Sequence, residues 1–281
     1  MAHPVAESFL KAAELFAADA RRQGNLLTFA PGEQIVYTGD IHGERANLNK
    51  IIAFAGLPAR PQRRLVCQEI IHGGPPDAQG ADRSVELLMR LARLKTACPD
   101  HVFILMGNHE LAQFTGNEIT KEGRGTCRDF NAGIEHAFGD WSHEVRSAAE
   151  TLMASLPLAA RCSNGMFMAH SLPSPGRMEL MDWDVLGRPY RPDDLHRGGS
   201  VYELVWGRGH TPPQLQQIAA RLGVRQFLLG HQHIATGFEI QHGCLLILAS
   251  DHPHGAVAVF DAGTGVPDDH LPDLVRPIAA L

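Results

Sequence analysis

Four short apolar runs of the sequence each end in a small residue that is followed by side chains of the kind that bind metal ions. The side chains are Asp40 and His42 after Val36–Gly39, Asn108 and His109 after Phe103–Gly107, His170 after Met166–Ala169, and His231 and His233 after Phe227–Gly230. If each run is a β-strand, these side chains lie beyond carboxyl ends of strands, where α/β sheets form ligand sites. Carboxylate, imidazole and amide ligands suit Mn²⁺, Fe²⁺ or Zn²⁺, so the pattern predicts one polynuclear metal site.

The composition is that of a globular protein whose charge does not favour nucleic acid. The 281 residues suit one large α/β domain or two small ones, and the formal net charge of -6 argues against binding nucleic acid through bulk charge. Five cysteines without CxxC spacing indicate reduced thiols in a cytosolic protein. No apolar run approaches the ~18 residues of a membrane span, and the N-terminus lacks a signal-peptide pattern. A cytoplasmic protein without membrane contact is therefore expected.

The elements that must position these side chains alternate between strands and helices. Strands are expected at 36–38, 64–68, 102–106, 158–161, 166–169, 226–229, 245–249 and 256–260, and helices at 5–22, 47–55, 85–95 and 214–222. Residues 1–30 are predicted to supply an N-terminal helix that packs on a single domain, 31–281. Within that domain, 111–150 form a mostly helical excursion and 173–200 an irregular one.

The order of the motifs resembles that of the calcineurin-like metallophosphoesterases, and more closely that of their phosphoprotein phosphatase branch. The matching text is Gly-Asp-Ile-His-Gly at 39–43, Gly-Asn-His-Glu at 107–110, Ala-His at 169–170 and Gly-His-Gln-His at 230–233. The resemblance runs from about Val36 to Phe260. It implies a four-layer α/β/β/α sandwich, in which two mixed β-sheets are flanked by helices and hold two divalent metal ions at their strand ends.

The resemblance also implies a role for each matched residue. Asp40 and His42 would bind the first metal ion, and His233 matches the histidine that completes this site in the wider superfamily. Asn108, His170 and His231 would bind the second ion. His109 matches the histidine that is proposed to protonate the leaving group.

The second motif departs from the family pattern, which is Gly-Asp-x-x-Asp-Arg-Gly. This chain has Gln-Glu-Ile-Ile-His-Gly-Gly at 68–74. Read without gaps, Glu69 falls on the Asp that bridges the metals, His72 on the Asp that supports the catalytic histidine, and Gly73 on the phosphate-binding Arg. Glu69 is the preferred ligand and His72 the alternative, because an imidazole nitrogen has one lone pair and binds one metal.

The missing arginine has two candidate replacements. Asp82 and Arg83 resemble the family's Asp-Arg text after an insertion, so that Arg83 would reach the phosphate and Asp82 would support His109. The alternative is that both residues form a solvated first helical turn. Arg208 resembles a second phosphate-contacting arginine.

The resulting functional hypothesis is a dinuclear metal-dependent phosphatase, in which a metal-activated hydroxide attacks a phosphomonoester. The partner would be a phosphorylated protein or small molecule. A hydrolase of dinucleoside polyphosphates or small phosphodiesters is the first alternative. A metal-binding regulatory module with little catalysis is the second, and the altered second motif is its main support. The sequence leaves open the natural substrate, the metal and the oligomeric state.

Overall fold

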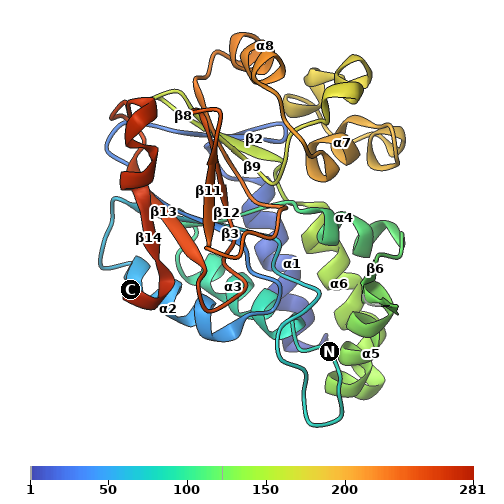
Figure 1. The fold of residues 1–281 in the computed structure, drawn as a ribbon. Helices are drawn as coiled ribbons and strands as arrows, with labels where there is room; N and C mark the ends of the chain where they lie inside the picture. Colours follow the sequence, from blue (N-terminus) through green and yellow to red (C-terminus); the bar gives the residue numbers. More distant parts are fainter. Residues whose placement is uncertain (1, 122) are drawn as a thin grey trace.

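Two mixed β-sheets form the centre of the computed structural model, which describes residues 2–121 and 123–281 (Figure 1). The larger sheet has the strand order β1 (Arg22–Gln23), β2 (Leu26–Phe29), β8 (Ala159–Cys162), β9 (Met166–Ala169), β10 (Gln226–Leu229), β12 (Leu245–Leu248) and β11 (Phe238–Gln241). The smaller has the order β14 (Val275–Pro277), β13 (Ala256–Asp261), β3 (Gln34–Asp40), β4 (Arg63–Gln68) and β5 (Val102–Leu105).

Each sheet contains three neighbouring parallel strands. These are β3, β4 and β5 in the smaller sheet, and β9, β10 and β12 in the larger. Parallel strands place their carboxyl ends on the same edge of a sheet. All six are buried along their whole length apart from one residue at most, which explains why they appear in the sequence as continuous apolar runs.

The two sheets pack against each other through a layer of buried apolar side chains. Phe29 and Phe103 pack edge to face in this layer, with ring centroids 5.1 Å apart. The buried Tyr37 of β3 adds a polar link, because its hydroxyl lies 2.9 Å from the carbonyl oxygen of Ala169 in β9 and accepts a hydrogen bond from Gln68. The link holds the ends of strands from both sheets in a fixed relation.

Helices cover the outer faces of the two sheets (Figure 1). They are α1 (Pro4–Ala17), α2 (Arg45–Ala55), α3 (Val85–Ala97), α4 (Asn108–Thr115), α5 (Thr126–Phe138), α6 (Ser142–Ala154), α7 (Ser200–Trp206) and α8 (Pro212–Leu222). α1 packs against α3 and α6 through a face that includes Phe9 and Phe16. The predicted four-layer sandwich is confirmed.

The N-terminal segment differs from the prediction of a helix over 5–22. α1 ends at Ala17, and β1 and β2 then add two strands to the edge of the larger sheet. Arg22 stabilises the chain after this helix, because its guanidinium donates hydrogen bonds to the carbonyl groups of Phe16 and Ser155.

The two excursions are formed by different kinds of structure. Residues 111–150 contain most of α4, all of α5, and α6 up to its last turn, together with the short strands β6 (Thr120–Lys121) and β7 (Arg124–Gly125). Residues 173–200 contain the 3₁₀ turns η2 (Pro175–Leu180), η3 (Trp183–Leu186) and η4 (Pro192–Leu195). Within the described ranges, no helix is both long and apolar enough to cross a membrane.

Candidate metal centre

Four side chains from different strand ends converge on one small volume. Asn108 Oδ1 lies 2.8 Å from both His170 Nε2 and His231 Nδ1, and these two nitrogens are 3.1 Å apart. Glu69 Oε2 lies 2.8 Å from the same His170 Nε2. Asn108, His170, His231 and Glu69 follow β5, β9, β10 and β4, respectively. The structure thus brings together the three residues expected at the second metal and adds the carboxylate of Glu69.

The hydrogen bonds of two histidines determine which ring nitrogen has a free lone pair. Gln68 donates its amide hydrogens to Tyr37 and to the carbonyl of Thr38, so its Oε1 accepts from His170 Nδ1, 2.9 Å away. His42 Nδ1 lies 3.1 Å from the carbonyl oxygen of Ile71, which can only accept. Both rings therefore carry hydrogen on Nδ1. Each directs an unprotonated Nε2 toward the other candidate metal-ligating atoms, as metal ligation requires.

Asp40 and His42 lie beside this group. Asp40 accepts a hydrogen bond from the backbone N–H of His231 at 2.9 Å, and its other carboxylate oxygen is 3.9 Å from His42 Nε2. His42, Glu69 and His109 offer ligand atoms that all lie within 4.8 Å of one another. Glu69 is therefore the residue shared by the two halves of the cluster.

Burial and mutual repulsion raise the pKa of the carboxyl groups in this region. Asp40 has its pKa raised to about 7, mainly by desolvation, and the negative charges of Glu69 and Asp251 contribute. Glu110, whose carboxylate accepts hydrogen bonds from the N–H groups of Ile70 and Ile71, has its pKa raised to about 8 by desolvation and by Glu69. Desolvation lowers the pKa of His231 to about 2. The site therefore combines neutral imidazoles with carboxylates that lack compensating positive charge.

The donor set fits divalent cations. It consists of carboxylate and amide oxygens and unprotonated imidazole nitrogens, without a thiolate. In addition, Asp251 Oδ1 is buried without a hydrogen-bond partner in the described part of the chain, and Asp251 lines the same cavity as Asp40. An unpaired carboxylate oxygen beside other carboxylates is the environment that a bound cation stabilises.

The backbone at this site is strained. Among the described residues, His42, Glu69, His72, His231 and His242 are those other than glycine with positive φ, and the first four belong to the site. Left-handed backbone costs a side-chain-bearing residue about 1 kcal/mol or more. The strain is concentrated on the loops that carry the candidate ligands, where it sets the direction of their side chains.

Gly107 is required by the carboxylate of Glu69. A Cβ atom at Gly107 would lie 2.1 Å from Glu69 Oε2, although the backbone φ of −102° suits any residue. We expect Gly107→Ala to displace this carboxylate and to weaken Mn²⁺ binding by roughly 10- to 100-fold, as loss of ligand orientation does elsewhere. Calorimetric titration with Mn²⁺ measures the change. Gly176→Ala is the matched control, because nothing lies within 4 Å of its added Cβ; equal affinities in the two variants would contradict the assignment.

His72 is directed toward His109 and away from the cluster. His72 Nδ1 lies 2.9 Å from His109 Nδ1, and His72 Nε2 lies 2.9 Å from Oε1 of Gln113. With both ring nitrogens engaged, the structure does not present His72 as a metal ligand. The carboxylate of Asp82, which the sequence suggested as the support of His109, accepts hydrogen bonds from the backbone N–H groups of Gly73 and Ser84.

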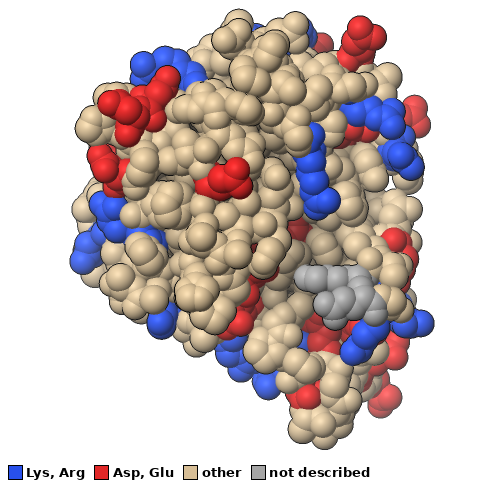
Figure 2. Space-filling view, in the orientation of Figure 1, with Lys and Arg blue, Asp and Glu red and all other residues tan. Residues whose placement is uncertain are grey.

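A cavity of about 510 Å³ opens over the cluster. Its wall includes Asp40, His42, Asn108, His109, Ile119, Thr120, Trp206, Arg208, His231, Gln232, His233 and Asp251. Figure 2 shows a hollow on this side of the molecule, with acidic atoms at its bottom and a basic side chain above it. A phosphoryl group with its leaving group can enter a cavity of this size.

The candidate arginines lie in different places. Arg208 lines the cavity, and its guanidinium lies 3.3 Å from the carbonyl oxygen of His231. Arg83 lies outside the cavity wall and forms a 2.6 Å ion pair with Glu86. Asp82 and Arg83 both precede α3, which begins at Val85, so neither residue lies in the first helical turn. His233 is exposed at the cavity rim, apart from the buried ligands.

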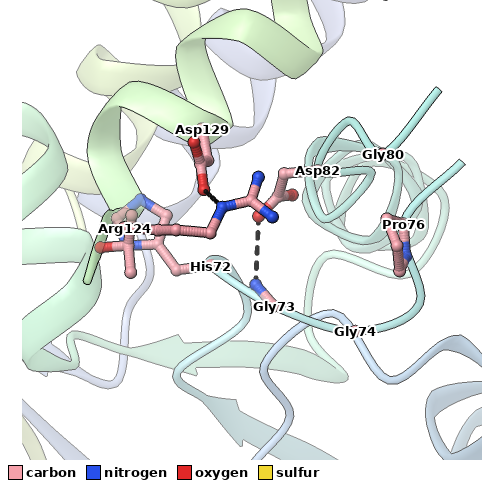
Figure 3. Close-up of a pocket in the computed structure, with 9 residues that line it drawn as sticks. His72, Gly73, Gly74, Pro76, Gly80, Asp82, Arg124 and Asp129 are labelled. Carbon is pink, nitrogen blue, oxygen red and sulfur yellow. Dashed lines mark hydrogen bonds and ion pairs between the residues drawn. The ribbon is translucent and has the colours of Figure 1, made fainter. Parts of the chain in front are cut away.

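A second hollow of about 360 Å³ lies on the other side of His72 (Figure 3). Arg124 extends across it and pairs with Asp129 at 2.9 Å, while Asp82 binds the backbone of Gly73. Gly73 stands where the resemblance places the phosphate-binding Arg, and with no side chain of its own it leaves this side of His72 open.

Comparison with known proteins agrees with this geometry. Residues 34–235 match the family model described as "Calcineurin-like phosphoesterase". The chain belongs to this family. It is 24% identical over 245 residues to serine/threonine-protein phosphatase T of Trypanosoma brucei brucei, with 78% of this chain and 46% of that protein covered. It is 25% identical over 243 residues to serine/threonine-protein phosphatase 5 of Arabidopsis thaliana, with 79% and 40% covered. The chain thus spans less than half the length of these relatives.

Solved structures share the fold of this chain. A protein serine/threonine phosphatase from Saccharomyces cerevisiae, described as similar to human phosphatase PP5, superposes with a TM-score of 0.69 at 16% identity. The superposition covers 98% of this chain and 92% of that one. A cold-active protein-tyrosine phosphatase of a psychrophile Shewanella superposes with a TM-score of 0.62 at 12% identity, covering 95% and 83%.

Four site residues of this calcineurin-like chain were missed from the sequence. They are Gln68, which orients His170, Glu110, which binds the loop backbone after Glu69, Gln113, which contacts His72, and Asp251 of the cavity wall. Asp251 directly follows a predicted strand, and Glu110 stands within the Gly-Asn-His-Glu text, so both had a signal in the sequence. Gln68 and Gln113 had none, because each acts through a contact between distant segments.

Proposed function

We propose that this chain is a phosphomonoesterase that uses two divalent metal ions. The observation that carries the proposal is the convergence of the candidate ligands Glu69, Asn108, His170 and His231. The distances are 2.8 Å for Glu69–His170, Asn108–His170 and Asn108–His231, and 3.1 Å for His170–His231. The shared position of Glu69 supports it as the ligand of both ions, with Asp40 and His42 holding the first. Mn²⁺, Fe²⁺ and Zn²⁺ all suit this donor set.

When bound, two such ions supply a nucleophile at neutral pH and positive charge for the phosphoryl oxygens. The chain's own residues then have separate tasks. Arg208 would contact the phosphoryl oxygens, as a guanidinium does by paired hydrogen bonds. His109 would donate a proton to the leaving oxygen, since it lies in the cavity wall beside Asn108. The displaced group would thus leave as a neutral alcohol.

The natural substrate is proposed to be a phosphorylated protein or peptide. Its relatives in Trypanosoma brucei brucei and Arabidopsis thaliana are serine/threonine-protein phosphatases, which supports this proposal, although the chain spans less than half of those proteins. All five cysteines are free thiols, four of them buried, which supports our proposal of a reducing compartment such as the cytoplasm.

The direct test is turnover by the purified chain after chelation and after addition of Mn²⁺. Substrates are p-nitrophenyl phosphate, a phosphoserine peptide, a phosphodiester and a dinucleoside polyphosphate. Monoester turnover that requires Mn²⁺ and exceeds diester turnover supports the proposal. Faster cleavage of the dinucleoside substrate would favour the small-molecule alternative. Bound Mn²⁺ with no turnover of any substrate would favour the regulatory module.

Arg208→Ala is expected to lower kcat/KM for phosphomonoesters by roughly 10- to 100-fold, because a charge-assisted bidentate contact is worth several times RT. Arg208→Lys should recover only part of the loss, since an ammonium group cannot form the paired contact. Steady-state kinetics measures both.

Arg83→Ala is the matched comparison for Arg208, because both arginines were candidates from the sequence. Since Arg83 lies outside the cavity wall and pairs with Glu86, its removal should leave kcat/KM near that of the wild type. A loss confined to Arg83→Ala would reverse the assignment of the two arginines.

A further inference from the structure

A row of buried side chains leads from α5 to His109. Asn131 Oδ1 accepts a hydrogen bond from Gln113 Nε2 at 3.0 Å, and Gln113 Oε1 lies 2.9 Å from His72 Nε2. His72 Nδ1 is in turn 2.9 Å from His109 Nδ1. Gln113, His72 and His109 are 3%, 2% and 8% exposed.

The chemistry of the amide gives the row a direction. Because Gln113 uses its N–H₂ group toward Asn131, it presents an oxygen to His72, and an amide oxygen only accepts. His72 Nε2 must therefore carry hydrogen. Burial lowers the pKa of His72 to about 4, so the ring is neutral near pH 7 and carries no second hydrogen. Its Nδ1 is then an acceptor.

The contact between the two imidazoles then requires a hydrogen from His109. Two ring nitrogens 2.9 Å apart share one hydrogen, and His72 Nδ1 has none to give. His109 must therefore carry hydrogen on Nδ1 in its neutral form. Gln113 thus determines, through the ring of His72, which nitrogen of His109 carries hydrogen. Gln113 itself lies outside the wall of the candidate metal cavity.

We propose that Gln113 and His72 are positioning residues that hold His109 in its Nδ1–H tautomer, so that Nε2 exchanges the proton with the leaving group. This inference rests on the proposed phosphomonoesterase function. As the bond between phosphorus and the leaving oxygen breaks, protonated His109 gives its Nε2 hydrogen to that oxygen and keeps the Nδ1 hydrogen. The oxygen of a water molecule forms the new bond to phosphorus, and this water loses a proton to solvent. Solvent then returns a proton to His109 Nε2.

The kinetic test compares two leaving groups. p-Nitrophenolate departs without protonation, whereas an alkoxide such as that of phosphoserine needs a proton. We expect Gln113→Leu to lower kcat for a phosphoserine peptide by about 10- to 30-fold and kcat for p-nitrophenyl phosphate by less than about 3-fold. Gln113→Met keeps the length of the side chain but offers His72 Nε2–H only a weak acceptor, so it should show the same selective loss as Gln113→Leu. Equal losses on both substrates in Gln113→Leu would overturn the proposal.

A second measurement uses the wild-type chain and does not depend on any variant folding well. Long-range ¹H–¹⁵N spectra of the full chain, with ¹⁵N-labelled histidine, metal-free and loaded with diamagnetic Zn²⁺, identify which nitrogen of neutral His109 bears hydrogen. We expect Nδ1–H in both samples. An Nε2–H tautomer, with turnover intact, would overturn the relay alone. Absence of turnover on both substrates would instead overturn the phosphomonoesterase function, and with it the proton-donor role.

Discussion

Glu69→Ala is expected to bind fewer than two metal ions per chain and to lose at least the roughly 10²- to 10³-fold in turnover that one charge-stabilising group contributes. Glu69 Oε2 lies 2.8 Å from His170, and its Oε1 accepts from the backbone N–H of His109. Without this carboxylate, the second ion would meet only neutral donors. Metal content by mass spectrometry and p-nitrophenyl phosphate kinetics with Mn²⁺ measure the two effects.

Two further variants make the test of Glu69 specific. Glu69→Asp keeps the charge but withdraws the carboxylate from the space above Gly107, and misplacement by ~1 Å can cost ~100-fold in rate. His72→Ala should retain both ions, because both nitrogens of His72 are engaged elsewhere. If His72→Ala loses an ion and Glu69→Ala does not, the assignment of the second motif is wrong.

The second prediction with a large effect is that the stabilisation of the protein by bound Mn²⁺ depends on pH. The increase in Tm that Mn²⁺ produces, measured against the chelated protein, should be larger at pH 8 than at pH 5.5. Protons compete with the ion for Asp40, whose pKa in the metal-free protein is about 7. Each pH unit below that value costs about 1.4 kcal/mol of binding, so the difference amounts to about 2 kcal/mol, or ~4–8 °C.

The metal-free protein should change in the opposite direction. Asp40 and Glu110 have pKa values raised above those of the unfolded chain, to about 7 and about 8. Their contribution to stability is therefore complete below about pH 4 and is lost as the pH rises through 7 to 8. Scanning calorimetry from pH 5 to 8.5 with a chelator should show a falling Tm.

Asp40→Asn separates the two titrating groups. The variant removes one of them, so its metal-free Tm should fall less with rising pH than that of the wild type. A Tm gain from Mn²⁺ that is equal at pH 5.5 and pH 8 in the wild-type chain would contradict the argument.

The sandwich and most of the cluster could be predicted from sequence because the relevant signals are local. A parallel strand buried on both faces is a continuous apolar run, and its ligand stands at the end of the strand or within three residues after it, as do Asp40, Asn108, His170 and His231. The strands β1, β2, β11 and β14 were missed because they are only two to four residues long, which is too short for a periodic pattern to stand out.

The second motif could not be resolved from sequence for a different reason. Glu69 and His72 both carry metal-type side chains, and spacing alone does not show where either ring or carboxylate points. The choice depends on Gln113 in α4 and on the space left by Gly107, which are long-range contacts. The place of Arg83 was equally undetermined, because the loop before it decides whether its side chain faces the cavity or Glu86.

The ligands come from chain positions that are far apart, and this has a consequence for how the protein folds. Asp40 and His231 are 191 residues apart, and each belongs to a different sheet. Closing such long loops is slow, so the cluster exists only after both sheets have formed and joined. Metal ions would then bind only the finished fold. Mn²⁺ should therefore slow unfolding while leaving the refolding rate unchanged. The ions would then stabilise the native state without directing the chain toward it.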